Sequence, residues 1–440
     1  MSGLQPYISV LRNNANFRRL WLSQSIANFG DWFGMLAIYA LIQQYSGSEI
    51  LIGLIIVVKL MSFSVFSPFA GYLTDRFDRK MLMYWCDIGR AVVVLGLLLV
   101  QNENHVWLVY MLISIQMMMA AVFEPAKSSS IPNITTKEEL VVANVISTLS
   151  WSVIFTLGMA IGGFATAWLG ITVVFILNSA TYLVSAWFVK RAEIPHLRTE
   201  SELNDLASPL IGITKGFRFL LRERQVLRPA LAKGWIEVSI GALVYLLILV
   251  SDDILLMGSI GLGLLYASRG LGTAVGPIVI RQFFPDETKW IKAIGLCMAL
   301  VGIGYMFVGT TTTLWLMLPL VVFAHAGSGA NWVISTILIQ KRTPDEYRGR
   351  VFSSEWLLFT LVESVSVMIA ATILYFNILT LQQTIILFGG ILVIAGFLWH
   401  LIITKEETLW QSNQLELNGE TTKGLTSEHS SHLGKQKARI

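Results

Sequence analysis

Five charged side chains interrupt apolar stretches that are otherwise long enough to lie in lipid: Asp31, Lys59, Glu237, Arg269 and Glu363. A charge inside a membrane helix costs roughly 2.5–3.5 kcal/mol on insertion scales, so such a residue usually faces a partner or a water-filled cavity. A carboxylate in that setting is suited to binding a proton or a cation. These residues therefore indicate movement of protons or ions as the chemistry of this chain.

Asp31 is the first candidate for a proton-binding group. Gln24, Asn28 and Asp31 occupy positions i, i+4 and i+7, and Met35 follows at i+11, so they share one face of a helix. A polar stripe on a membrane helix belongs on a water-filled cavity, and a desolvated carboxylate there binds protons more readily. The alternative is a permanent salt bridge between Asp31 and Lys59.

The second half of the chain carries further candidates. Lys233 and Glu237 are one helical turn apart, which permits a local pair or leaves Glu237 facing a cavity. His325 and Asn331 lie in a later apolar stretch. For His325 the alternatives are a proton relay and a hydrogen-bonded structural residue.

Arg269 and Glu363 are each central in an apolar stretch, and they could pair if their helices are neighbours. Their pair would be either a fixed contact or one that breaks during a conformational change. The sequence does not choose between the two.

The elements that position these groups are membrane helices. Of the 440 residues, 54% are hydrophobic and 14% are charged, against roughly 25% charged in soluble domains. About 20 apolar residues cross a bilayer. This predicts an all-α integral membrane protein with twelve transmembrane helices, at 19–44, 50–72, 81–101, 106–127, 139–167, 171–189, 230–250, 258–280, 291–309, 314–340, 352–376 and 383–404.

Lys and Arg are concentrated in the connections at one end of these spans. The connections at one end contain no Lys or Arg, namely 45–49, 102–105, 168–170, 251–257, 310–313 and 377–382. The basic residues gather at the other end, which the positive-inside rule assigns to the cytoplasm. We therefore expect cytoplasmic N- and C-termini in a multi-pass protein of the cell (inner) membrane. Residues 1–18 lack an apolar core, so no cleavable signal peptide is expected.

The long connection after the sixth span divides the chain into two sets of six helices. The expected units are residues 1–190, a cytoplasmic loop over 191–229 that is helical near Ile211–Arg224, and residues 230–404. Residues 405–440 form a polar tail for which we expect disorder.

A charged loop joins the second and third spans, with the sequence Gly71-Tyr-Leu-Thr-Asp75-Arg76-Phe-Asp78-Arg79-Lys80. It resembles the signature loop of the major facilitator superfamily, Gly-x-Leu-x-Asp-Arg-x-Gly-Arg-Lys, with Asp78 in place of the usual Gly. The resemblance implies the major facilitator fold, in which two six-helix halves are related by pseudo-symmetry.

The resemblance also implies a conformational latch at this loop. Asp75 would meet the N-terminus of the eleventh helix, and Arg79 would pair with Glu124. Contacts of this kind form in one conformation and break in the other. Asp87 and Arg90 are expected to extend the network, together with Gly71, Arg76 and Lys80. The alternative is a solvated turn with mixed charges.

Three further stretches resemble an export branch of this family. Gly158-Met-Ala-Ile-Gly162-Gly163 is similar to the end of the antiporter motif Gly-Pro-x-x-Gly-Gly, although the same spacing serves close helix packing. Arg348-Gly-Arg350 and the Phe-Gly-Asp-Trp around Asp31 resemble macrolide efflux pumps and the enterobactin exporter.

Together these features predict a proton-coupled exporter of amphipathic small molecules such as a drug or siderophore. The chain lacks the phosphate-binding Gly-x-x-x-x-Gly-Lys-Ser/Thr loop, so the expected energy source is the proton gradient and no cofactor. We expect a monomer in the bilayer, with no enzyme activity, no metal site and no nucleic-acid partner. The alternatives are uptake or facilitated diffusion on the same fold, and a non-transporting membrane sensor.

Overall fold

Long helices account for nearly all of the structure. The computed structural model describes residues 5–195 and 209–409, without the side chains of some residues inside these ranges. In the first half, the helices are α1 (Gln5–Asn13), α2 (Ala15–Tyr45), α3 (Glu49–Arg76), α4 (Arg79–Gly96), α5 (Val106–Ser130) and α6 (Lys137–Arg191). In the second half they are α7 (Pro209–Arg222), α8 (Arg224–Leu249), α9 (Gly258–Phe283), α10 (Trp290–Thr310), α11 (Leu314–Arg342), α12 (Asp345–Tyr375) and α13 (Leu381–Leu398).

Short turns extend several of these helices or connect them. They are η1 (Leu97–Leu99), η2 (Glu103–His105), η3 (Ile131–Asn133), η4 (Val250–Ile254), η5 (Glu287–Lys289) and η6 (Trp399–Ile403). No strand is found in the described part of the chain. The prediction of an all-α membrane protein is confirmed.

The predicted fifth and sixth spans form one helix with a break. Within the described residues, eleven helices are long and apolar enough to cross a membrane, and the segment 153–191 counts as one of them. Gly170 interrupts that segment with φ +80° and ψ 163°, a backbone conformation that glycine adopts without steric cost. The break lies in the predicted connection 168–170, so the chain crosses twice here and the total agrees with twelve spans.

Helix starts follow from capping side chains. Asp78 begins α4 by accepting a hydrogen bond from the Met81 amide at 2.8 Å, with an ordinary φ of −62°. This explains why Asp replaces the family's Gly in the loop: the position needs a capping side chain and no left-handed backbone. Thr136 and Glu139 form a capping box at the start of α6.

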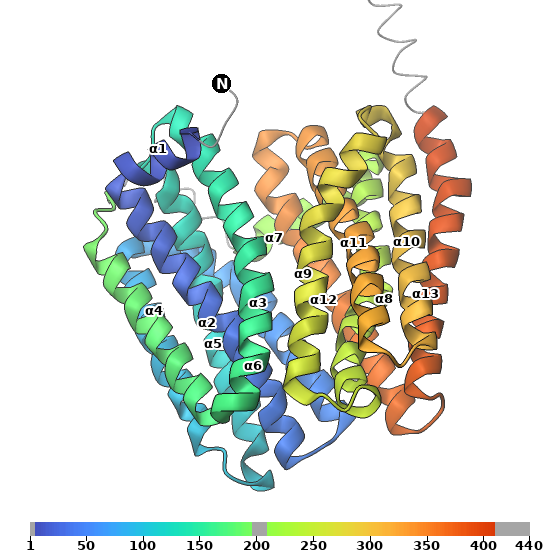
Figure 1. The fold of residues 1–440 in the computed structure, drawn as a ribbon. Helices are drawn as coiled ribbons and strands as arrows, with labels where there is room; N and C mark the ends of the chain where they lie inside the picture. The colour runs from blue at the N-terminus through green and yellow to red at the C-terminus, as the bar shows by residue number, and fades with distance from the viewer. Residues whose placement is uncertain (1–4, 196–208, 410–440) are drawn as a thin grey trace, which may run out of the picture.

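The helices form two bundles that stand side by side, blue to green and yellow to red in Figure 1. In the first bundle α2 packs on α6, and α4 packs on both α5 and α6. In the second bundle α9 packs on α11, and α10 packs on both α11 and α13. Helix α1 and the end of α13 lie at the same end of the molecule (Figure 1), as an even number of crossings requires.

Two helix pairs make the most extensive contacts between the bundles, α6 with α9 and α3 with α12. In the first pair, Gly163 and Gly263 face each other so closely that a Cβ on either would meet the backbone of the other. In the second pair, Ser64 Oγ on α3 donates a hydrogen bond to Thr360 Oγ1 on α12 at 3.0 Å. Any motion of one bundle against the other must therefore change these contacts.

Candidate functional site

Asp31 lies at the centre of a hydrogen-bonded cluster inside the first bundle. Its carboxylate accepts hydrogen bonds from the hydroxyl of Tyr182 on α6 and from Gln116 Nε2 on α5 at 3.2 Å. Arg90 Nη1 on α4 lies 3.8 Å from its other oxygen. The Asp31 side chain retains 25% of its accessible surface, whereas Arg90 retains 4%. Four helices thus converge on one carboxylate.

Asp87 and Arg90 complete the same cluster. Arg90 Nη2 contacts Asp87 Oδ1, and Ser185 Oγ donates to Asp87 Oδ2 at 2.5 Å. The guanidinium carbon of Arg90 lies 4.6 Å from the ring centre of Tyr182. Because we expected Asp87 and Arg90 to extend the loop network, their placement with Asp31 corrects that prediction. One cation bridges two acids here, so neither acid is buried without a partner.

The remaining residues of the predicted polar stripe lie around this cluster. Lys59 on α3 makes no ion pair of 4 Å or less with a described side chain, although its charge interacts with that of Asp31 over a longer distance. The alternative of a direct Asp31–Lys59 salt bridge is therefore not observed. Gln24 and Asn28 are half-buried on α2.

A second cluster of charges lies in the second bundle and has a different geometry. Gly241 on α8 packs against the Cα, Cγ and carbonyl oxygen of Glu363 on α12. Glu237 is one turn before Gly241, retains 7% of its surface, and interacts electrostatically with Glu363 and with Arg269 on α9. No salt bridge of 4 Å or less joins any of these three charges to a described side chain.

Two predicted pairs in this bundle are therefore corrected. Arg269 and Glu363 are neighbours whose charges interact, but they do not form a close ion pair. Lys233 does not pair with Glu237: its Nζ lies 2.8 Å from Glu355 Oε1 on α12. Because α8 packs on α12, the Lys233 side chain pairs with Glu355 on α12 and not with Glu237, one turn further along its own helix.

Arg269 also reaches the boundary between the bundles. Its guanidinium carbon lies 5.5 Å from the ring centre of Phe155 on α6 and 5.6 Å from that of Tyr266 on its own helix. A cation held over aromatic faces is stabilised without a carboxylate partner. Arg269 is thus the charge of the second cluster that touches the first bundle.

His325 and Asn331 are buried on α11. His325 Nε2 and the hydroxyl of Tyr305 on α10 are 2.7 Å apart, and His325 retains 1% of its surface. Asn331 Nδ2 donates to the Ala232 carbonyl at 3.4 Å. These contacts favour the structural alternative for His325.

The loop motif is described only in part. The proposed contact with the eleventh helix stays a prediction. The described residues do not include the surroundings of Gly71 or the side chains of Asp75, Arg76, Arg348 and Arg350.

The other half of the latch prediction is corrected by the side chains that are described. Arg79 Nη1 donates to the Ser129 carbonyl at 3.1 Å. Glu124 instead pairs with Lys127 at 2.5 Å. Arg79 still reaches the end of α5, as expected, but through a carbonyl. Lys80 is half-buried at the start of α4.

The three antiporter-like glycines serve close packing. A Cβ at Gly158 would meet Trp32, and a Cβ at Gly162 would meet the backbone of Phe33, both on α2. Gly163 faces α9 in the same way. The motif therefore sets how closely α6 approaches one helix in each bundle.

Sequence reasoning missed several members of these clusters. Gln116 and Tyr182 were not selected, although each is a polar group inside an apolar stretch, which is the signal that identified Asp31. Tyr39 was not among the candidate residues either, yet it interacts electrostatically with Arg269 and Glu363 across the bundle boundary.

A further ion cluster was also missed. Glu407 Oε2 lies 2.7 Å from Arg228 Nη1, and its other oxygen lies 2.5 Å from Arg342 Nη2. The cluster fastens the basic ends of α8 and α11 to the end of the last span. Its residues lie at helix ends, where a charged residue does not stand out from its neighbours as it does inside an apolar stretch.

Comparison with known proteins identifies the fold. A model of the Major Facilitator Superfamily matches residues 20–365. A crystal structure of a bacterial homologue of the human lysosomal transporter Spinster, inward-facing and unoccupied, superposes with a TM-score of 0.69 at 15% identity, covering 92% of this chain and 98% of that one. At this identity the superposition establishes the arrangement of helices alone.

Relatives in sequence include transporters named for export. The MFS-type transporter YfiS of Bacillus subtilis is 27% identical over 364 residues, 78% of this chain and 83% of YfiS. The proposed bacilysin exporter BacE of the same species is 22% identical, covering 92% of this chain and 98% of BacE. Macrolide efflux protein A of Streptococcus pyogenes is 21% identical, covering 81% and 88%.

Proposed function

Because this chain belongs to the Major Facilitator Superfamily, we propose that it is a proton-coupled exporter of amphipathic small molecules that works by alternating access. The names of BacE and macrolide efflux protein A support export of amphipathic compounds. The distribution of Lys and Arg supports cytoplasmic termini, because basic loops stay on the cytoplasmic side. Export then runs from the basic end of the bundle to the end without basic residues.

The observation that carries the proposal is the second charge cluster. Glu237, Glu363 and Arg269 lie within membrane helices and make no close ion pair with a described side chain. An isolated charge in that environment is costly, so it is retained where it has a function. Two carboxylates accompany one guanidinium, which leaves one negative charge over. A proton is the smallest group that neutralises it.

A coupling step follows from this arrangement. With a proton bound between Glu237 and Glu363, the remaining carboxylate and Arg269 balance in charge, and the bundles can move without an excess charge in the membrane. After the proton leaves, the excess charge returns. Arg269 touches Phe155 of the other bundle, so its position connects the protonation state to the α6–α9 contact. Such a link between a charge and a two-state interface is sufficient for coupling.

Transport in membrane vesicles tests the proposal directly. Inside-out vesicles that contain the full chain, acid-loaded and monitored with a pH-sensitive dye, are given chloramphenicol. We expect proton efflux and accumulation of the compound, both abolished when nigericin collapses the pH gradient. Vesicles without the protein are the control.

Two results would contradict the proposal in different ways. Accumulation that persists after the gradient is collapsed would rule out coupling to protons. Uptake only in right-side-out vesicles would reverse the direction and favour the uptake alternative. The two outcomes are separated because each vesicle orientation is measured with and without nigericin.

A further inference from the structure

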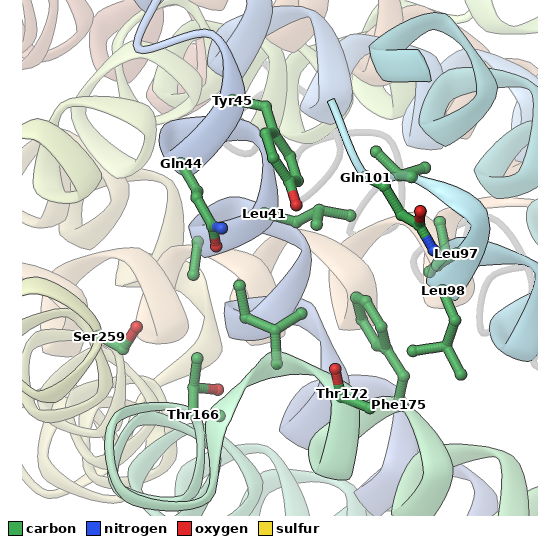
Figure 2. Close-up of a pocket in the computed structure, with 14 residues that line it drawn as sticks. Leu41, Gln44, Tyr45, Leu97, Leu98, Gln101, Thr166, Thr172, Phe175 and Ser259 are labelled. Carbon is green, nitrogen blue, oxygen red and sulfur yellow. The ribbon is translucent and has the colours of Figure 1, made fainter. Parts of the chain in front are cut away.

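A cavity of about 520 Å³ lies at the end of the molecule that has no basic residues. It is bounded by the ends of α2 and α4, by both sides of the break at Gly170 in α6, and by the start of α9. Figure 2 shows Tyr45 and Gln101 on one side of it, with Thr166 and Ser259 on the other. It is separate from both charge clusters, since none of their residues lines it.

The lining is polar but carries no charge. Its hydrogen-bonding side chains are amides and hydroxyls, namely Gln44, Tyr45, Gln101, Thr166, Thr172 and Ser259. Leucines and Phe175 supply apolar surface between them (Figure 2). Ligand sites combine an apolar lining with a few polar groups in this way, and volumes of roughly 300–1,000 Å³ suit small molecules. A lining without charge favours an uncharged ligand, because a charged one would lose its hydration without a counter-ion.

Thr166 provides independent evidence for a ligand. Its hydroxyl is buried without a hydrogen-bond partner, and the residue retains 6% of its surface. Thr side chains within helices commonly bond the carbonyl four residues earlier, as Thr384 does with Thr380 at 2.9 Å. An unsatisfied buried hydroxyl costs free energy that a bound partner would recover.

The cavity adjoins the contact between the bundles. Thr166 is one turn beyond Gly163, which packs against the carbonyl of Ser259 and the Cα of Gly263 on α9. Ser259 belongs both to this contact and to the cavity lining. Separation of α6 from α9 at this end would therefore open the cavity toward the space between the bundles.

We propose that this cavity is a second binding site, on the release side, for an uncharged solute that forms hydrogen bonds and carries apolar groups. It rests on the proposed function, because the expected occupant is the exported compound after it has passed the bundle interface. When α6 moves away from α9, the buried hydroxyl of Thr166 is exposed to the cavity and donates a hydrogen bond to this occupant, while the amides of Gln44 and Gln101 bind its polar groups.

Equilibrium binding to the purified full chain in lipid nanodiscs tests the site. The probes are tritiated chloramphenicol, which is uncharged with hydroxyl and amide groups, and ethidium, which is a cation of similar size. We expect saturable chloramphenicol binding that Thr166→Val weakens by about threefold to tenfold, as loss of one hydrogen bond implies. Thr166→Ser should restore it. Thr384→Val is the matched control, because its hydroxyl already has a backbone partner.

A charge placed in the lining sharpens the test. Gln44→Glu should weaken chloramphenicol binding and strengthen ethidium binding. Absence of saturable chloramphenicol binding, or equal affinities for Thr166→Val and Thr384→Val, would overturn the proposal. Binding is measured without transport, so its outcome is independent of proton coupling: a site that binds in a protein without coupled transport would contradict the proposed function alone.

Discussion

The two bundles contain the same set of charges within their membrane helices, in different arrangements. Each has two carboxylates and one arginine: Asp31, Asp87 and Arg90 in the first, and Glu237, Glu363 and Arg269 in the second. Arg90 contacts both of its carboxylates, and Tyr182, Gln116 and Ser185 add hydrogen bonds. Arg269 contacts neither of its carboxylates and lies over aromatic rings.

This difference separates a structural role from a functional one. A carboxylate held by a cation and several hydrogen-bond donors connects the helices that carry those groups, and removing one partner of such a cluster is strongly destabilising. A buried carboxylate without such partners is free to change its protonation state. Our proposal therefore places proton coupling at Glu237 and Glu363, and we expect Asp31, the first candidate from sequence, to hold the first bundle together.

The largest effect should follow from removing the cation of the first cluster. Arg90→Ala leaves Asp31 and Asp87 buried without a counter-ion, which costs about 3–5 kcal/mol. Since native proteins are stable by only about 5–15 kcal/mol, we expect a severe loss of thermal stability in detergent. Arg191→Ala, which removes an exposed arginine, is the control. Equal melting temperatures for the two variants would show that the cluster does not stabilise the bundle.

Substitutions in the second cluster should reduce the coupling of transport to the pH gradient instead of the stability of the protein. Glu237→Gln and Glu363→Gln each mimic a permanently protonated carboxyl. We expect at least about a tenfold loss of transport driven by a pH gradient, with downhill exchange retained, because neutral side chains still permit the bundles to move. The measurement compares gradient-driven accumulation with counterflow in proteoliposomes.

Glu287→Gln is the matched control for these variants, because Glu287 is an exposed residue paired with Lys341. A loss of counterflow equal to the loss of coupling in the glutamine variants would indicate misfolding or substrate contact and contradict the assignment.

A smaller effect is expected for Asp31→Asn. The amide oxygen can still accept from Tyr182 and Gln116, while the contact with Arg90 loses its charge. We expect a stability loss of about 1–2 kcal/mol and less than a twofold change in coupled transport, followed by thermal melting and by the vesicle assay. If proton-coupled transport is lost while the protein remains folded, the result would support Asp31 as the proton-binding group.

The smallest effect should come from His325. His325→Phe leaves the Tyr305 hydroxyl without its partner at a cost of about 1–3 kcal/mol, and it should not change the pH dependence of transport. Adding Tyr305→Phe removes the orphaned group, so the double variant should recover part of the lost stability. A shift in the pH profile with His325→Phe would instead support the relay.

The membrane crossings and the positions of the charges along them could be predicted from the sequence, because each depends on the residues of a single segment. Twelve crossings followed from apolar length and from loops without basic residues, and Gly170 marks the break predicted between the fifth and sixth spans. Asp31, Glu237, Arg269 and Glu363 were recognised because a charge in an apolar stretch is costly wherever it points. Gln116 and Tyr182 lay in the same kind of stretch, but neutral polar groups give a weaker signal.

The partners of these charges could not be predicted from the sequence. Arg90 was expected beside the loop motif and contacts Asp31. For Lys233 a pair with Glu237 was one alternative, and it contacts Glu355. Glu124, expected to meet Arg79, pairs with Lys127. In each case the sequence placed a charge at the right depth along its helix, but not against the right neighbour.

The sequence by itself determined that five charges interrupt the apolar helices, at which depth they lie and in which helices. Only the tertiary structure decided that Arg90 contacts both of its acids while Arg269 leaves Glu237 and Glu363 without a close cation. The physical reason is that depth depends on spacing along one helix. Partnership depends on the rotation and packing of several helices at once, and a Coulomb interaction at 3 Å differs greatly from one at longer range in a medium of low dielectric.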